Sequence, residues 1–274
     1  MKIGSTPIAK KLSKFSTDFK FMKKAGFTAI DNRDFIWPKN KAYKLSEAKF
    51  NKYFNNLKIK LLKYNLECYQ MHGMWCTDLF DLDKNENWAT LINYYEKSMK
   101  ACAILGCKYL VIHPRLPFGW QMKPEQDEFC YKNNLEFVKR LLPYAIKYDV
   151  TICLENMPCN FPYTSIDGII RCIDEINDEH VQMCLDTGHY NVVDYSLDIY
   201  STILKINQRL KVLHLHDNHN DGDYHLLPGQ GTLDWAMLFK GLKEIGFLSE
   251  LKSLQTIRFP SLYISVVYLY FAIT

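Results

Sequence analysis

Short apolar runs alternate with longer stretches of helical period along this chain of 274 residues, and this alternation predicts an α/β fold. We expect a (β/α)8 TIM barrel with an irregular or incomplete eighth strand, because seven strands are visible and helical segments lie between them. The sequence contains no Gly-x-Gly-x-x-Gly motif after its first strand, so an open dinucleotide-binding sheet is the weaker alternative. Barrels of this length commonly form one domain, and we interpret residues 1–274 as a single TIM-barrel domain.

The strands and helices follow one another in a regular order. Apolar runs of strand length occur at 2–5, 28–31, 67–72, 109–113, 151–155, 182–186 and 211–216. Helical periodicity occurs at 46–64, 88–105, 133–148, 166–176, 198–207 and 235–245. Gly26 and Gly106 stand between a helix and the next strand, where a left-handed residue ends a helix. The predicted unit is therefore helix, glycine turn, strand and polar loop.

The C-terminal tail at 248–274 departs from this pattern. Gly246 should precede strand eight, but 248–256 has no clean apolar core, and 259–274 is apolar and nearly uncharged. The fourteen residues at 261–274 are too few for a membrane span, which needs about 20 residues. The tail could form a makeshift eighth strand at 262–267, or it could be an aggregation-prone end. It carries no acidic residue after Glu250.

Composition limits the classes of function. The chain has 34 Lys and Arg against 30 Asp and Glu, a formal net charge of +4, which argues against an acidic tail or a strongly basic nucleic-acid coat. Hydrophobic residues make up 48% and charged residues 23%, so the chain can bury a large core. Nine cysteines without a Cys-x-x-Cys pair argue against a disulfide framework. No secretory signal is apparent, and we expect a cytoplasmic protein that does not bind a membrane.

Polar residues capable of binding a metal recur where the predicted strands end, which is the face on which barrel enzymes build their sites. Six of the eight histidines lie there. The candidate residues, in order along the chain, are His72, His113, Glu155, Asp186, His189, His214, His216, Asp223 and His225. Any one of them has an ordinary explanation as a helix cap or a loop hydrogen-bonder. Together they place imidazoles and carboxylates around one opening, where a divalent cation compensates the charge.

The spacing indicates which residues share a metal. His214 and His216 are two apart on a strand, so both point into the barrel. Asp186 and His189 are three apart at a strand-to-helix turn, which lets His189 contact the substrate beside an Asp186 ligand. Glu155 ends a buried strand, where its charge would otherwise be unpaired. We therefore interpret it as a metal ligand and not as a helix cap. Mixed nitrogen and oxygen ligands suit zinc, manganese, cobalt or iron better than calcium.

Around these residues the sequence resembles the xylose isomerase-like barrel superfamily, which contains sugar isomerases and epimerases together with apurinic-site endonucleases. The matching segments are VIHP at 111–114, LENMP at 154–158, CLDTGH at 184–189, HLHDN at 214–218 and HLLPGQG at 225–231. They extend over roughly residues 70–247 in the order expected of that family. The resemblance implies a metal-dependent enzyme, and it leaves the reaction open.

Similarity to the epimerase branch implies a divalent metal ion (Mn, Zn, Co or Mg) held by Glu155, Asp186 and His214. The family's fourth ligand, a Glu on strand eight, has no clear counterpart here. The resemblance implies that Glu155 is both ligand and catalytic base, and that His189 is catalytic and holds a substrate oxygen. The implied activity is a sugar or sugar-phosphate isomerase or epimerase that abstracts a proton next to a carbonyl.

The endonuclease branch carries a cluster of three zinc ions on the same rim, so it stays as an alternative. Positions matching its additional ligands are His72, His113, His189, Asp223 and His225. Our candidates for substrate binding or for additional metal ions are His72, His113, His216, Asp223 and His225. His189 is left out of this group because it already has a catalytic role. The modest net charge makes a nucleic-acid partner the less favoured interpretation. A third alternative is a catalytically impaired barrel that binds sugar or metal, and a homo-oligomer is compatible with each.

Overall fold

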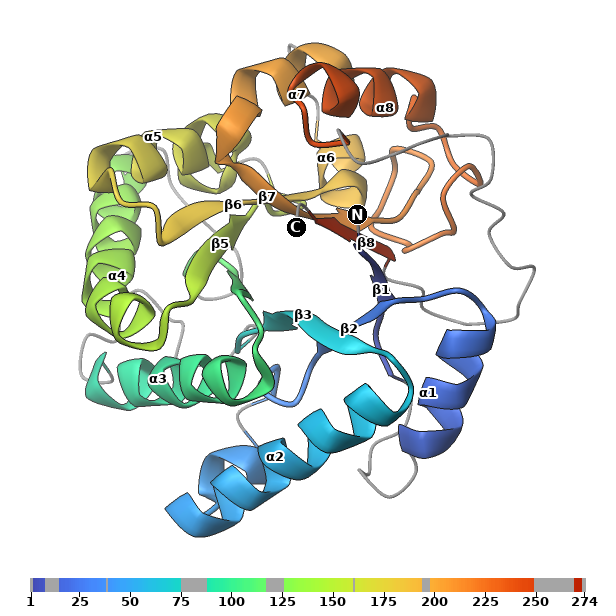
Figure 1. Ribbon diagram of the computed structural model, residues 1–274. Coiled ribbons are helices and arrows are strands. Elements are labelled where there is room, and N and C mark those ends of the chain that lie inside the picture. The colour runs from blue at the N-terminus through green and yellow to red at the C-terminus, as the bar shows by residue number, and fades with distance from the viewer. Residues whose placement is uncertain are drawn as a thin grey trace.

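The computed structural model describes residues 2–7, 15–37, 39–74, 88–116, 126–159, 161–193, 198–248 and 269–272. In these residues eight strands form a closed barrel in the order β1 to β8, and helices surround it (Figure 1). The strands are β1 (Lys2–Ser5), β2 (Ala29–Asn32), β3 (Glu67–His72), β4 (Tyr109–Ile112), β5 (Thr151–Glu155), β6 (Val181–Asp186), β7 (Leu210–Leu215) and β8 (Leu269–Ala272). Strands β1 to β7 pair in parallel, which confirms the predicted fold class.

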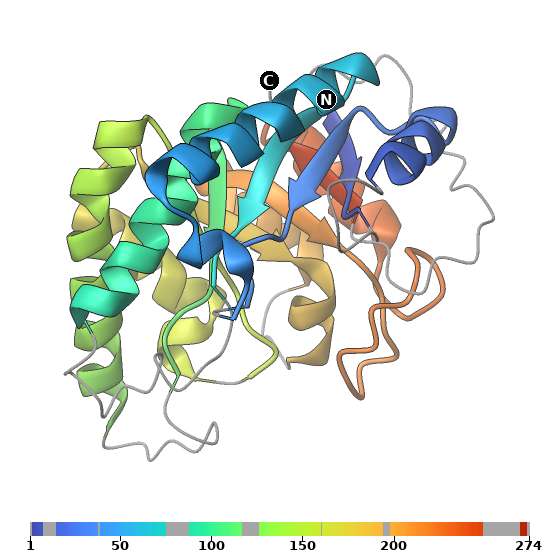
Figure 2. The ribbon, with the colours of Figure 1, turned by 90° about the horizontal axis from the view of Figure 1, so that it is seen from below.

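The helices lie outside the barrel and connect successive strands (Figures 1 and 2). They are α1 (Phe15–Lys24), α2 (Glu47–Lys63), α3 (Trp88–Leu105), α4 (Asp127–Tyr148), α5 (Ile166–Ile176), α6 (Thr187–Val192), α7 (Ile199–Ile206) and α8 (Trp235–Glu244), with 3-10 helices η2 (Lys41–Lys44), η7 (Pro162–Thr164) and η8 (Asn207–Arg209). Helix α4 begins before the expected position 133, with Asp127 and Glu128 in its first turn. Within the described ranges, no helix combines the length and the apolar character that crossing a membrane requires.

Left-handed residues end the helices, as the sequence predicts. Gly26 and Gly106 adopt φ of 90° and 76°. Asn65, Asp149 and Asn177 do the same after α2, α4 and α5, with φ of 50°, 52° and 50°. Asn and Asp tolerate this conformation better than most side chains, so the chain uses them in place of glycine.

Strand alternation places an apolar layer directly beneath the polar mouth of the barrel. Val111, Cys153, Cys184 and Val212 form a fully buried cluster, separate from the larger core between sheet and helices. Side chains two residues apart on a strand point to the same side. The residues two positions after these four are His113, Glu155, Asp186 and His214. These four side chains therefore point into the barrel like the apolar layer, one step closer to its C-terminal mouth.

Strand β8 is the irregular member of the barrel. It runs antiparallel to both of its neighbours, with Tyr270 opposite His214 on β7 and opposite Gly4 on β1. The expected irregularity of the eighth strand is thus confirmed, whereas the position proposed for it, 262–267, lies outside the described residues. Because β8 runs in the reverse direction, its carboxyl end does not lie at the mouth that the other seven strands share. Strand β8 completes the wall beside His214 through its backbone.

Candidate metal centre

The candidate residues converge at the carboxyl ends of strands β3 to β7. His72, Glu155 and Asp186 are the last residues of β3, β5 and β6. His113 directly follows β4, and His214 and His216 come from the end of β7 and the residue after it. All six side chains are buried. These six residues therefore lie on one rim of the barrel, where the sequence places them.

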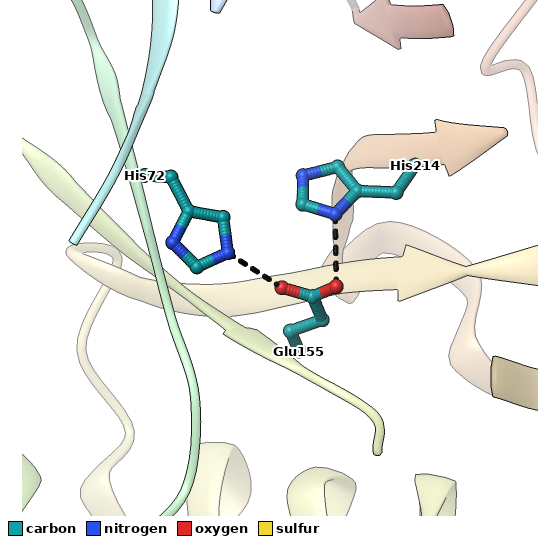
Figure 3. Close-up of side chains that lie close together, drawn as sticks. All are labelled: His72, Glu155 and His214. Carbon is teal, nitrogen blue, oxygen red and sulfur yellow. Dashed lines mark hydrogen bonds and ion pairs between the residues drawn. The ribbon is translucent and has the colours of Figure 1, made fainter. Parts of the chain in front are cut away.

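Glu155 stands at the centre of the first group of side chains (Figure 3). Its Oε1 is 2.8 Å from His214 Nδ1, and its Oε2 is 3.2 Å from His72 Nε2 and 3.0 Å from His113 Nε2. Burial opposes ionisation of this carboxyl, but His214 and His113 outweigh it and hold the pKa of Glu155 well below its usual value. Glu155 is therefore an ionised carboxylate that is only 2% exposed to solvent.

His113 and His214 respond differently to the same carboxylate. Burial lowers the pKa of His113 to about 4, so this imidazole is neutral at pH 7. Burial works in the same direction on His214, but the neighbouring Cys184 and Glu155 outweigh it and raise the pKa of His214 well above its usual value. The proton on His214 thus compensates the negative charge of Glu155. A divalent cation bound in the same place would displace this proton.

Asp186 centres a second group and also shapes the backbone around it. Its carboxylate lies 2.8 Å from His216 Nε2 and 3.8 Å from His189 Nδ1. Its Oδ1 also accepts a hydrogen bond of 2.8 Å from the backbone N–H of His189, which caps helix α6. His189 Nδ1 donates to the carbonyl oxygen of Asn156 at 2.7 Å, which directs Nε2 toward Asp223 Oδ2 at 3.4 Å. The strand-to-helix turn therefore brings Asp186 and His189 together, as their spacing predicts.

Asp223 joins a third group in the loop that follows β7. Its Oδ2 lies 3.2 Å from His225 Nε2, and its Oδ1 lies 3.7 Å from His216 Nδ1. The rings of His216 and His225 stack with their centroids 4.0 Å apart. His225 adopts φ of 51°, a conformation that non-glycine residues adopt rarely. The loop backbone thus turns sharply to present this imidazole to the mouth.

Three sets of side chains could each hold a metal ion among the described residues. They are His72, Glu155 and His214; Asp186, His189 and His216; and His216, Asp223 and His225. The three expected ligands divide between the first two sets, and His214 Nδ1, 3.7 Å from Asp186 Oδ2, connects them. Nitrogen and carboxylate donors in these sets fit a divalent transition ion, and they do not distinguish zinc from manganese or cobalt.

Several residues that support the centre were not singled out from the sequence. Asn156 accepts from the N–H of Asp186 at 2.8 Å and donates to its carbonyl oxygen at 3.0 Å. Asp217 anchors the loop that follows β7: its carboxylate accepts from Gly229 N and Trp235 Nε1 at 3.0 and 2.8 Å. Gln70, which contacts His214, lies within a buried strand without any motif to mark it.

A match to a family model decides the relationship that the motifs suggest. The model described as a xylose isomerase-like TIM barrel matches residues 19–258. The chain belongs to this family. Within it, the chain is 29% identical over 203 residues to a probable endonuclease 4 of Metamycoplasma arthritidis, a match that covers 62% of this chain and 66% of that protein. It is 30% identical over 112 residues to a D-psicose 3-epimerase of Enterocloster bolteae, covering 40% of this chain and 35% of that protein.

Solved structures repeat the same fold. A D-tagatose 3-epimerase-like protein superposes with a TM-score of 0.71 at 21% identity, covering 90% of this chain and 87% of the other. At this identity the likeness shows the barrel fold alone. The chain spans less than two thirds of the length of the two curated relatives above. The choice between their activities therefore rests on the chemistry of the centre.

Proposed function

We propose that this protein is a metal-dependent isomerase or epimerase of sugars that moves a proton on a carbon next to a carbonyl, with Glu155 as the base. The observation that carries the proposal is the place of Glu155, a carboxylate buried at the centre of the barrel mouth within 3.2 Å of three imidazoles. A buried carboxylate that stays ionised can accept a proton from substrate without competition from bulk water. The epimerases among the similar proteins fit this proposal.

The proton chemistry follows from the residues around Glu155. Glu155 takes the proton from the carbon, and the electron pair of that C–H bond passes to the adjacent carbonyl, giving an enediolate. His189, oriented by the Asn156 carbonyl, holds a substrate oxygen through Nε2. Glu155, Asp186 and His214 would hold a divalent ion, which would supply Lewis-acid polarisation of the substrate's carbonyl and hydroxyl oxygens. Glu155 then returns the proton to the neighbouring carbon, the hydroxyl proton of the first carbon passes to the former carbonyl oxygen, and the first carbon becomes the new carbonyl.

The lack of a strand-eight Glu favours isomerisation over epimerisation. Inverting a carbon requires that a proton leave one face and arrive on the opposite face, which needs a second acid. The chain has no acidic residue after Glu250, and β8 has the sequence Leu-Tyr-Phe-Ala. A single base can carry a proton between two adjacent carbons on one face, which converts an aldose into a ketose. We therefore favour aldose–ketose isomerisation within the proposed class.

The charge of the loops that follow β5, β6 and β7 favours a substrate without phosphate. The segments 155–165, 186–198 and 216–234, which follow β5, β6 and β7, contain no Lys or Arg. The last of them contains four aspartates, Asp217, Asp221, Asp223 and Asp234. Phosphate groups are bound by cationic side chains or backbone N–H clusters, and the aspartates of the loop after β7 repel them. Neutral hydroxyl groups suit the Asn, His and Asp side chains of this mouth.

Incubation with unphosphorylated aldoses and ketoses in deuterated water tests the proposal, with Mn²⁺, Co²⁺ or Zn²⁺ supplied. We expect isomerised product that retains part of the substrate hydrogen, because one buried base transfers it. Glu155→Gln should lower the rate by a factor of about 10² or more, while the control His219→Gln, an exposed position on the same loop, should not. Absence of both isomerised product and exchange next to the carbonyl, with each of the metals, would reject the proposal.

A second candidate function is supported by the number of metal-capable sets. Three sets joined through His216 and His214 resemble the three-ion requirement of a zinc phosphodiesterase acting at abasic DNA sites. The similarity to a probable endonuclease 4 points the same way. The cation-free rim segments argue against it, because binding to the DNA backbone depends on Lys and Arg.

Metal content and one oligonucleotide separate the candidates. One metal ion per chain, measured by elemental analysis, supports the isomerase, and about three support the nuclease. Cleavage of a duplex with a single abasic site by zinc-loaded protein would establish the second candidate over the first. Metal or sugar binding without either reaction would indicate a barrel that has lost its chemistry.

A further inference from the structure

Gln70 is a fully buried side chain on β3 that reaches across the barrel to His214 on β7. Its Nε2 lies 3.0 Å from His214 Nε2. The other ring nitrogen of His214, Nδ1, faces the carboxylates, 2.8 Å from Glu155 Oε1 and 3.7 Å from Asp186 Oδ2. Nδ1 is therefore the nitrogen that would bind a metal, and Gln70 contacts the nitrogen on the far side of the ring.

The identity of the Gln70 atom that faces the ring controls which ring nitrogen can bind a metal. A carboxamide nitrogen only donates hydrogen bonds, whereas the carboxamide oxygen only accepts them. When Gln70 Nε2 donates to His214 Nε2, the ring hydrogen must sit on Nδ1, where it leaves no lone pair for a metal. When the amide turns by 180°, Oε1 accepts from His214 Nε2–H, and the Nδ1 lone pair points at the carboxylates.

The second orientation changes which amide atom of Gln70 is paired. Within the described part of the chain, the buried Gln70 Oε1 makes no hydrogen bond. After the turn Oε1 accepts from His214 Nε2–H and Nε2 takes the former place of Oε1, so the number of paired amide atoms is the same in both orientations and metal binding at Nδ1 selects between them. The oxygen and nitrogen of a carboxamide occupy almost the same space, so turning the amide requires no repacking of the barrel.

We propose that Gln70 is the positioning residue of the metal centre: its Oε1 accepts a hydrogen bond from His214 Nε2–H and thereby directs the Nδ1 lone pair of His214 at the metal. This inference rests on the metal centre of the proposed function and is independent of the reaction. The arrangement is the one by which ligating imidazoles are held in a single tautomer, with the other ring nitrogen hydrogen-bonded to an acceptor.

Two substitutions at Gln70 test the proposal through metal binding without substrate. Gln70→Glu keeps an acceptor and removes the donor, and Gln70→Met has a similar shape without either. We expect Gln70→Met to bind Zn²⁺ and Co²⁺ about 10–100-fold more weakly than the wild-type protein. Gln70→Glu should bind at least as tightly as wild type. Thr151→Val, a buried change at the opposite end of β5, is the matched control and should bind as wild type does.

The tautomer itself is measured by long-range ¹H–¹⁵N NMR on the zinc-loaded proteins, with the His214 signals assigned by substitution. Wild type and Gln70→Glu should show His214 with hydrogen on Nε2. Zinc affinity of Gln70→Met within about twofold of the control, or hydrogen on Nδ1 in the loaded wild type, would overturn the role of Gln70 while leaving the metal centre intact. Wild-type protein that binds no divalent metal would overturn both. Circular dichroism verifies that each variant folds.

Discussion

At the scale of single residues, the imidazole of His189 links protonation to stability. Burial disfavours its charged form, but Asp186, Asp223 and Glu155 outweigh burial and raise the pKa of His189 to about 9. Its ordinary value is 6.5, so between pH 6.5 and 9 the folded protein keeps a proton that the unfolded chain releases. This contribution to stability is complete below pH 6.5 and is lost as the pH rises through about 9.

We therefore expect the free energy of unfolding of metal-free protein to fall between pH 6.5 and 9, by up to about 3 kcal/mol from this group. Urea unfolding in the presence of chelator at three pH values measures the change. His189→Gln should flatten part of the slope, and the exposed His219→Gln should leave it as in wild type. A slope unchanged by His189→Gln would show that other groups hold the proton.

Gly188 permits the close packing of helix α6 against the centre. A Cβ atom at this position would lie 1.9 Å from His216 Cε1, so the imidazole would have to move. We expect Gly188→Ala to weaken metal binding about tenfold or more and to destabilise the fold by about 1–3 kcal/mol. Calorimetric titration and thermal unfolding measure both effects. The control is Gly222→Ala, where the three atoms nearest to the new methyl all belong to the tip of the Tyr224 ring, on an exposed side chain that can turn away.

At the scale of elements, the sequence predicts what local chemistry determines. Strands β3 and β5 and helices α3 and α5 have the predicted bounds, because apolar period and capping residues mark their ends. Helix α6 escapes prediction, since six residues are too few to show a helical period. The direction of β8 escapes as well, because a local apolar run carries no information about the strand with which it pairs.

The loop after β7 depends on one carboxylate, that of Asp217. Asp217 accepts hydrogen bonds from the backbone N–H groups of Asn218, Gly229 and Leu233 and from the indole of Trp235. We expect Asp217→Ala to destabilise the protein by about 2–4 kcal/mol, since two buried and two partly buried donors lose their acceptor. It should also expose the segment 219–231 to cleavage by thermolysin, which is used because the segment contains no Lys or Arg for trypsin. Asp221→Ala, on the exposed part of the same loop, should match wild type in both assays.

At the scale of the whole molecule, the barrel collects residues that are distant in the chain. The motifs locate the ends of β3 to β7, and the barrel geometry implies that these ends meet, so the members of the candidate site could be foreseen. Their division into three sets could not, because it depends on side-chain directions that differ by a few ångströms. The contact of Gln70 with His214 joins residues 144 positions apart, and only the closed barrel creates it.

Metal removal is the prediction that belongs to the assembled molecule, because the centre ties five strands and the β7 loop together. His72, His113, Glu155, Asp186 and His214 come from five successive strands, so an ion bound there stabilises the folded state alone. At a free metal concentration of 100 times the dissociation constant, the gain is about 2.7 kcal/mol per site. For a chain of this size such a gain corresponds to a rise in the melting temperature of roughly 5 °C or more.

Thermal unfolding with EDTA and with added Zn²⁺, Mn²⁺ or Co²⁺ measures this rise. Glu155→Gln should abolish the metal-dependent part of the rise that belongs to the first set, while His219→Gln retains all of it. Equal melting temperatures with and without metal would mean that the carboxylates and imidazoles of these strands do not bind a metal ion.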